Sequence, residues 1–377
     1  MPVIFWLSAL LTVYVYVGYP VILAVLRRWA RITIRDERHL PQVSLVIAAY
    51  NEEQVLHEKL QNSLALQYPQ ERLEIVVASD GSTDATNMIV KAYAHKGVVL
   101  HEVVPRGGKA RALGMVVPQV RGEIVVLSDA NTMYQPDALQ KLVRNFADPT
   151  VGAVSGDVQL VDAAPSHSRS EGLYYRYERW LQGVESELGS IIGADGAMYA
   201  LRRSLFQPPS VGLVLDDFVT SMNVARAGYR VVYEPEAVAT EQGTLSSQEE
   251  FRRKVRIVSG GMQALRRGEG LPRLQQPLLL FCYVSHKLLR WFVPCFLLGL
   301  FLSSFWLSGT FVYTCAYYGQ VLFYGVAGMY AVGVPRLRHW SGSGVPYYFC
   351  LVNGAALIGL WKGLLHTPSG VWQRTTR

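Results

Sequence analysis

Four short acidic motifs stand where the sequence predicts that apolar strands end. In chain order they are Tyr50-Asn51-Glu52-Glu53, Asp80-Gly81-Ser82-Thr83-Asp84, Ser128-Asp129-Ala130-Asn131 and Leu215-Asp216-Asp217-Phe218. Apolar runs precede the first three, at residues 43–48, 75–78 and 124–127. In an open α/β sheet, ligands bind outside the carboxyl ends of the strands, so we expect these acids to converge on one crevice. Gathered carboxylates are costly unless a cation or polar substrate offsets them, which favours a catalytic or metal site over a solvated acidic face.

The third motif has the residue types of a metal site. Asp129 and Asn131 are two positions apart in an extended segment, so their side chains point the same way. A carboxylate and an amide oxygen suit Mg²⁺ or Mn²⁺, which can also bind phosphate oxygens. An Asx-turn at the end of the strand is the structural alternative.

The fourth motif places two adjacent carboxylates, Asp216 and Asp217, in an apolar setting. One of them could act as a general base within hydrogen-bond reach of an attacking hydroxyl. Alternatively, they are the N-cap and first-turn residues of a helix. We favour the base because of the other acidic motifs.

Two further segments could contact a nucleotide. Asp80 could accept hydrogen bonds from a base or a ribose, although a helix N-cap after a strand explains it as well. Gly107-Gly108-Lys109 could hold a phosphate through backbone amides and an ammonium group, or be a plain loop-to-helix junction. It lacks the spacing of a P-loop.

A basic run, Arg252-Arg253-Lys254-Val255-Arg256, falls on a predicted helix. Its guanidinium groups could bind a diphosphate. It could equally lie on a membrane surface, and composition does not decide between the two.

The elements that must position these residues alternate as strand, turn and helix from about residue 41 to 270, which predicts an α/β domain with a largely parallel sheet. The periodicity predicts helices over residues 52–66, 83–94, 109–117, 137–146 and 169–188, and further strands over 151–155 and 158–160.

Apolar stretches flank this domain. Residues 2–26 and 291–335 contain no charge, which fits one membrane crossing and a hairpin of two that turns at residues 308–310. Arginines follow the first stretch rather than precede it, which favours a retained anchor over a signal peptide and places the following domain in the cytoplasm. A shorter segment at about 345–361 is compatible with a span, an interfacial helix or a re-entrant segment.

The predicted organisation has four parts. They are an N-terminal transmembrane helix (1–26), a basic juxtamembrane linker (27–40), a cytoplasmic catalytic domain (41–270) and a C-terminal membrane region (271–377) with the hairpin at about 288–335. The net charge of +7 lies largely beside the apolar segments, which indicates anionic lipid headgroups rather than a nucleic acid as the partner. The four cysteines lie at no metal-binding spacing and are expected to be small buried hydrophobes.

With its motifs in this order, the chain resembles the membrane-anchored family 2 glycosyltransferases, which include the synthases of poly-N-acetylglucosamine, hyaluronan and cellulose. The resemblance covers almost the whole chain. It implies a GT-A (Rossmann-like) α/β catalytic domain with transmembrane helices at both ends. It also implies inverting transfer from a nucleotide-diphosphate sugar, with UDP as the expected nucleotide and Mg²⁺ or Mn²⁺ as the cofactor.

The resemblance also implies site residues, motif by motif. The expected donor-binding residues are Ala49, Tyr50, Asn51, Glu52, Asp80, Gly81, Ser82, Lys109, Ser128, Asp129 and Ala130. Asp129 and Asn131 stand where the family's DxD metal motif stands, and Gly193-Ala194-Asp195-Gly196 resembles its acceptor segment. Asp217 resembles the aspartate that acts as base in its TED motif, with Asp216 in place of the glutamate. Arg253 and Arg256 are expected at the diphosphate.

Two departures from the family pattern bear on mechanism. Asn131 replaces the second acid of the DxD motif, which implies weaker or indirect metal coordination there. Processive members carry QxxRW, where this chain keeps the arginine as Arg256 but has Arg253 for glutamine and Ile257 for tryptophan. Processive synthesis and the addition of one sugar therefore both stay open.

The sequence thus predicts a multi-pass inverting glycosyltransferase of the bacterial inner membrane, active on the cytoplasmic side. Its expected partners are a nucleotide-sugar donor, membrane lipids, and a growing exopolysaccharide or lipid-linked oligosaccharide as acceptor. The alternatives are single-sugar transfer to polyprenyl phosphate, a polysaccharide secretion or transport component, and a catalytically silent scaffold.

Overall fold

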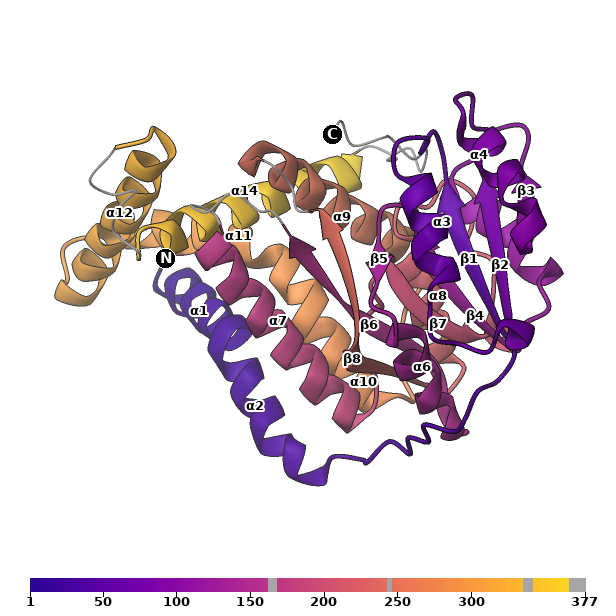
Figure 1. The fold of residues 1–377 in the computed structure, drawn as a ribbon. Helices are drawn as coiled ribbons and strands as arrows, with labels where there is room; N and C mark the ends of the chain where they lie inside the picture. Colours follow the sequence, from indigo (N-terminus) through magenta and orange to yellow (C-terminus); the bar gives the residue numbers. More distant parts are fainter. Residues whose placement is uncertain (162–167, 243–245, 335–341, 366–377) are drawn as a thin grey trace.

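The computed structural model describes residues 1–161, 168–242, 246–334 and 342–365. One eight-stranded sheet, in the order β3-β2-β1-β4-β7-β6-β8-β5, forms the core of the domain on the right-hand side of Figure 1. Its strands are β1 (Val43–Ala49), β2 (Leu73–Ser79), β3 (Val98–Glu102), β4 (Ile124–Asp129), β5 (Met133–Tyr134), β6 (Val151–Val161), β7 (Met198–Arg202) and β8 (Arg230–Gln242).

The half of the sheet from β3 to β4 is parallel, as the sequence predicts for β1, β2 and β4; the edge strand β3 was not predicted. β1 pairs with β2 on one side and with β4 on the other, and β3 pairs with β2. All of β1 is buried, which is why it appears in the sequence as a continuous apolar run. Ala49 lies opposite Ser79, and Ala48 lies opposite Asp129, so these strands end at one edge.

The other half is mixed, so the expectation of a largely parallel sheet is correct only as far as β4. β7 runs antiparallel to β4 and β6, and β5 runs antiparallel to β8, whereas β6 and β8 are parallel. β6 is one continuous strand where two short ones are predicted. The sequence conceals β8 because Pro235 and a register irregularity opposite residues 155–157 interrupt its alternation.

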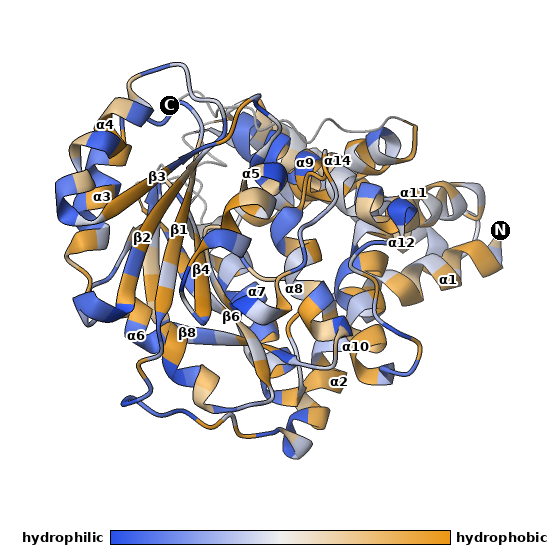
Figure 2. Ribbon diagram, turned by 90° about the vertical axis from the view of Figure 1, so that its right-hand side faces the viewer, coloured by the Kyte–Doolittle hydropathy of each residue, from blue (hydrophilic) through white to orange (hydrophobic). Residues whose placement is uncertain are grey.

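Helices cover both faces of the sheet. They are α3 (Leu56–Leu64), α4 (Thr86–Ala92), α5 (Lys109–Val116), α6 (Ala138–Val143), α7 (Ser168–Leu188), α8 (Asp216–Arg226) and α9 (Ser247–Arg267). Alternate residues of the strands point to two cores, one under α3, α4 and α6 and the other under α5 and α8. Figure 2 shows the central strands β1, β2 and β4 as largely hydrophobic. α3 and α4 begin three or four residues later than predicted because the acidic motifs before them form turns.

Long apolar helices lie beside the sheet domain (Figure 1). They are α1 (Pro2–Val13), α2 (Tyr19–Leu26), α10 (Pro277–Cys282), α11 (Leu289–Trp306), α12 (Phe311–Ala331) and α14 (Gly344–Leu365). Within the described ranges, three helical stretches are long and apolar enough to cross a membrane, namely Pro2–Trp29, Pro277–Trp306 and Gly344–Leu365. The segment predicted at 345–361 is thus one of these three, whereas α12, the second arm of the predicted hairpin, is not.

Charged side chains connect α7 to the helix that contains α10 and α11. Arg290 donates a hydrogen bond to Glu178, and Glu178 also pairs with His286 at 3.3 Å. The other ring nitrogen of His286 lies 2.6 Å from Glu185. Because Glu178 and Glu185 are seven residues apart, they lie on the same face of α7, and this network fixes that face against the apolar region.

Close packing between α9 and α11 gives a first prediction. Trp291 of α11 covers Gly261 of α9 so tightly that a Cβ on the glycine would lie 2.3 Å from the indole ring. Gly261→Ala is therefore expected to lower stability by about 1–3 kcal/mol through overpacking. The matched control is Gly183→Ala in α7, where a Cβ meets nothing within 4 Å. Thermal unfolding in detergent measures both, and equal midpoints for the two variants would contradict this packing argument.

Candidate active site

Three of the predicted motifs meet at Lys109, the first residue of α5. Its Nζ donates to Asp129 Oδ1 at 2.6 Å and to the Gly196 carbonyl oxygen at 3.3 Å. Burial alone would lower the pKa of Lys109, but Asp129, together with Asp216 and Asp217, outweighs burial and raises it. The ammonium group is therefore held charged among carboxylates.

Asp216 and Asp217 are the first two residues of α8, after the N-cap Leu215, so the alternative that placed them at a helix start describes their position. Asp217 Oδ1 accepts a hydrogen bond from the Phe218 amide at 2.7 Å. Burial and, second to it, the neighbouring Asp216 raise the pKa of Asp217 to about 6, against the opposing effect of Lys109. Burial also raises the pKa of Asp216, one of whose oxygens is buried with no hydrogen-bond partner among the described residues. A carboxylate with a pKa near neutrality suits proton transfer.

The predicted acceptor segment lies directly against Asp217. A Cβ on Gly196 would lie 2.5 Å from Asp217 Oδ2, so only glycine leaves room for the carboxylate there. The Ala194 amide donates to Ser221 Oγ, and the Asp195 amide donates to Ser155 Oγ, each at 3.0 Å. These bonds tie the segment to α8 and β6, and they hold Asp195 within electrostatic range of Asp217.

The first two motifs are bonded to each other at the ends of β1 and β2. Asn51 adopts a left-handed conformation (φ 52°), and its side-chain oxygen accepts from the Thr83 amide at 2.8 Å. The Asn51 amide donates to Ser82 Oγ at 3.2 Å, and the Glu52 amide donates to Thr86 Oγ1 at 2.8 Å. A short polar side chain at Asn51 tolerates this backbone conformation, which the turn requires.

Asp80 binds the glycine loop that precedes Lys109. Its carboxylate is buried and accepts hydrogen bonds from the amides of Gly107 and Gly108 at 2.8 and 2.7 Å. The Arg106 guanidinium lies 3.5 Å from the centroid of the Tyr50 ring. Asp80 is therefore linked to Asp129 through residues 107–109 rather than by direct contact.

The other predicted donor residues lie at the same strand ends. Ala49 closes β1, Gly81 and Ser82 follow β2, and Ser128 and Ala130 flank Asp129 at the end of β4. Gly81 has a positive φ of 66° and lies against Arg106, so a side chain there would be strained.

The basic run lies on α9 and faces the site with two of its members. Arg253 donates to Tyr175 Oη at 3.3 Å and lies within electrostatic range of Glu241 and Asp195. Arg256 acts on Asp216, lowering its pKa. Lys254 instead pairs with Glu250 at 3.3 Å.

The residues predicted to bind a metal, Asp129 and Asn131, lie close to Glu241 of β8. Asn131 Nδ2 donates to Glu241 Oε1 at 2.7 Å, and burial raises the pKa of Glu241 with a further contribution from Asp129. Within the described part of the chain, no group of three or more His, Cys, Asp or Glu side chains is arranged to hold a metal ion. The carboxylate of Asp129 and the side-chain oxygen of Asn131 therefore fit an open Mg²⁺ or Mn²⁺ site rather than a closed protein cage.

Sequence reasoning missed Lys59 and Glu241. Lys59 of α3 is completely buried; its Nζ donates to Ser128 Oγ at 2.8 Å and lies 4.1 Å from the Tyr134 ring centroid. Burial lowers the pKa of Lys59 to about 7, against the opposing effect of Asp129. A signal was present, because Lys59 falls with Leu56 and Leu60 on the apolar stripe of its helix.

The chain is similar in sequence to known glycosyltransferases. A family model described as "Glycosyltransferase like family 2" matches residues 41–260, more than half of the 377-residue chain. A probable glycosyltransferase, YdaM, of Bacillus subtilis is 28% identical over 236 residues, which cover 59% of this chain and 56% of that protein. A poly-beta-1,6-N-acetyl-D-glucosamine synthase of Staphylococcus aureus is 27% identical over 238 residues, with 60% and 56% covered. The chain thus aligns with little more than half the length of these curated relatives.

A solved structure shares the whole architecture. The mannosyltransferase PcManGT from Pyrobaculum calidifontis, in complex with GDP-Man and Mn²⁺, superposes with a TM-score of 0.70 at 23% identity and covers 96% of this chain and 99% of that one. At this identity the likeness shows the fold, a GT-A domain with associated apolar helices. Taken with the family match, it leads to one conclusion: the chain belongs to glycosyltransferase family 2.

Proposed function

We propose that this protein is an inverting, metal-dependent glycosyltransferase that moves a sugar from a nucleotide-diphosphate donor to an acceptor hydroxyl. One observation carries the proposal. Asp217, with a pKa raised to about 6, lies against Gly196, whose carbonyl oxygen accepts from the same Lys109 ammonium that binds Asp129. The candidate base Asp217 and the Lys109 ammonium, which is paired with Asp129, therefore both lie at Gly196.

The roles of the residues follow from this placement. Asp217 accepts the proton of the acceptor hydroxyl as the new bond forms. Arg253 and Arg256 approach from α9 and offset the negative charge of a diphosphate. The carboxylate of Asp129 and the side-chain amide oxygen of Asn131 would hold the divalent cation, which would supply Lewis acidity toward the leaving diphosphate.

We assign the donor as a UDP-sugar and the acceptor as a growing exopolysaccharide or a lipid-linked oligosaccharide. The named activity of the Staphylococcus aureus relative supports a polysaccharide product. Arg253 and Ile257, which replace the glutamine and tryptophan of processive enzymes, favour a second candidate: transfer of a single sugar to polyprenyl phosphate.

We further propose that the enzyme is a multi-pass membrane protein with its catalytic domain in the cytoplasm. Three stretches are long and apolar enough to span a membrane. Arg27, Arg28, Arg31 and Arg35 follow the first of them, and positive charge marks the cytoplasmic end of a span.

The test uses the full chain purified in detergent. It is incubated with a panel of UDP- and GDP-sugars in the presence of Mg²⁺, Mn²⁺ or a chelator, and the products are separated by size and lipid partition. A UDP-sugar with a divalent cation should give transfer that the chelator abolishes. A monosaccharide-lipid would establish the second candidate. No transfer and no donor hydrolysis with any sugar would overturn the proposal.

The pH dependence of transfer follows from Asp217. Because burial raises its pKa to about 6, the base loses its proton, and becomes active, only as the pH rises through that value. At about pH 5, roughly one-tenth of such groups are deprotonated, so kcat/KM should be about tenfold lower than at about pH 7.5. A profile that stays level across this interval would show that no group with this pKa limits the reaction.

A further inference from the structure

A cavity of about 800 Å³ lies against the linker that follows the N-terminal helix. Its walls come from α7, from Asp157 of β6 with Tyr233 and Pro235 of β8, and from part of the linker, namely Arg27, Ala30, Arg31, Ile32, Thr33 and Arg35. None of the residues assigned to the candidate active site lines this cavity.

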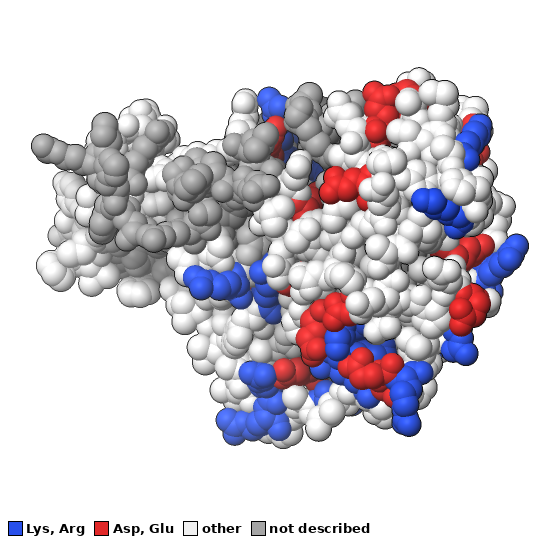
Figure 3. Space-filling model, in the orientation of Figure 1, with Lys and Arg blue, Asp and Glu red and all other residues white. Residues whose placement is uncertain are grey.

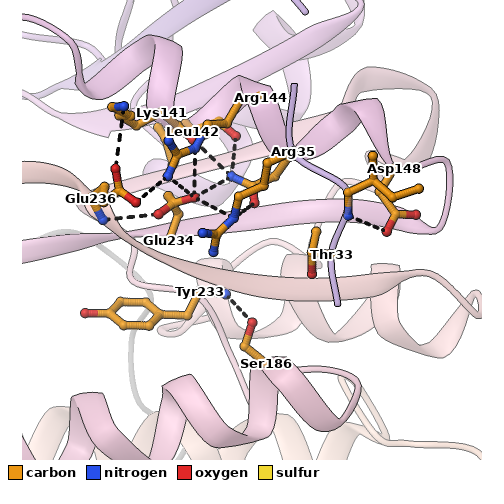
Figure 4. Close-up of polar contacts among 12 residues, drawn as sticks. Thr33, Arg35, Lys141, Leu142, Arg144, Asp148, Ser186, Tyr233, Glu234 and Glu236 are labelled. Carbon is orange, nitrogen blue, oxygen red and sulfur yellow. Dashed lines mark hydrogen bonds and ion pairs between the residues drawn. The ribbon is translucent and has the colours of Figure 1, made fainter. Parts of the chain in front are cut away.

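The linker wall of the cavity is fixed to the domain. The Arg31 amide donates to the Glu187 carbonyl oxygen at 2.7 Å. The Arg35 guanidinium lies 3.4 Å from the buried Glu234 carboxylate, which also pairs with Arg144 at 3.1 Å. Figure 4 shows Arg35 and Arg144 converging on Glu234, above Tyr233 and Ser186 of the cavity wall. The cavity is therefore part of the fold and not a space beneath a loose tail.

The walls carry more positive than negative charge. Four arginines line the cavity against two carboxylates; they are Arg27, Arg31, Arg35 and Arg179, with Asp157 and Glu187. Arg27 pairs with Glu187 at 2.6 Å, and Arg179 pairs with Asp157. The Arg31 side chain forms no ion pair or hydrogen bond with any described residue, so its guanidinium is available to an anion.

Apolar and indole side chains stand at the same place. Trp29 ends the first candidate span and is 65% exposed, and Ile32 is 93% exposed. Trp180, which lines the cavity as Ile32 does, is 40% exposed. Tryptophan is enriched at membrane–water interfaces. Figure 3 shows Lys and Arg, interspersed with Asp and Glu, along the lower edge of the molecule, where α2 ends in Figure 1. With the membrane location proposed above, this cavity lies at headgroup depth.

We propose that the cavity binds the headgroup of an anionic phospholipid from the surrounding bilayer. Arg31 contacts the lipid phosphate, and the acyl chains pass Trp29 and Ile32 along the end of the first span. A free phosphate would make no use of these exposed apolar side chains, whereas a bilayer lipid covers them. The back wall includes Asp157, two residues after Ser155, whose hydroxyl accepts from the Asp195 amide, so a bound lipid borders the strand that supports the acceptor segment.

The test measures lipid retention by the intact chain. Detergent-purified protein is incubated with phosphatidylglycerol or phosphatidylcholine, and bound lipid is counted by native mass spectrometry. Arg31→Gln should reduce retained phosphatidylglycerol about fivefold, the effect of one arginine at a membrane surface. The matched control is Arg38→Gln, in the same linker but outside the cavity, with a side chain that is 91% exposed. It should retain phosphatidylglycerol as the wild type does.

Three outcomes would overturn the proposal. Equal losses in the Arg31 and Arg38 variants would mean a diffuse surface charge effect. Equal retention of phosphatidylcholine and phosphatidylglycerol by the wild type would mean that the cavity does not select anions. Displacement of phosphatidylglycerol by excess inorganic phosphate would assign the site to a soluble anion. Ile32→Asn is an independent test, because it should lower the retention of phosphatidylglycerol without changing the charge of the cavity wall.

Discussion

Replacing Asp217 with asparagine is expected to lower sugar transfer by about 10²- to 10⁴-fold, the usual contribution of a general base. The amide has nearly the shape of the carboxylate, so it fits beside Gly196, where space is short. It cannot accept the proton of the acceptor hydroxyl. Binding of the nucleotide donor should stay within a few-fold of the wild type, because Asp217 touches the acceptor segment and not the loop that Asp80 holds.

Two further variants sharpen this prediction. Asp137→Asn, at the N-cap position of α6, where the side chain makes no capping hydrogen bond, should leave transfer unchanged. Asp216→Asn removes a carboxylate that raises the pKa of Asp217, so that pKa should fall. The activity of the Asp216→Asn variant should therefore persist to lower pH than that of the wild type. Transfer rates and donor affinities, measured separately, distinguish these effects. Wild-type transfer by the Asp217 variant would exclude this residue as the base.

The sequence predicts β1, β2 and β4 of the parallel half because they have local signals, whereas the short, partly exposed edge strand β3 was missed. β1 is a buried apolar run, and α5 begins at Lys109, directly after two glycines. β7 and β8 escape prediction because their neighbours are distant in the chain. β7 pairs with β4 and β6, and β8 pairs with β6 across a bulge, so tertiary pairing and not local pattern makes them strands.

The same difference between local signals and tertiary contacts decides which residues of the candidate site could be predicted. The acids at strand ends were visible because a parallel sheet brings the ends of its strands together. The partner of Asn131 was not visible, since Glu241 lies 110 positions further along, on the unpredicted β8. Composition also does not show which way the side chains of the basic run at residues 252–256 point. Packing of α9 turns Arg253 and Arg256 toward the acids and Lys254 toward Glu250.

Replacing Lys109 with methionine should have the second largest effect, a loss of about 10²-fold in kcat/KM, as expected when a preorganised charge is removed from an active site. Its Nζ is 2.6 Å from Asp129 Oδ1 and opposes the rise in the pKa of Asp217. Without it, the pKa of Asp217 moves above about 6, and the ascending limb of the pH profile moves to higher pH.

That displacement of the pH profile separates an electrostatic role from a structural one. Lys109→Arg keeps the charge and should keep the limb near its wild-type position even if the rate falls. The matched control is Lys91→Met, which removes an exposed ammonium paired with Glu102 at 2.7 Å and should change neither rate nor profile. If the Lys109→Met enzyme is slow but the ascending limb of its pH profile stays at the wild-type position, the ammonium does not act on Asp217. The pairing of base and cation proposed for this site would then be wrong, while the assignment of Asp217 could still stand.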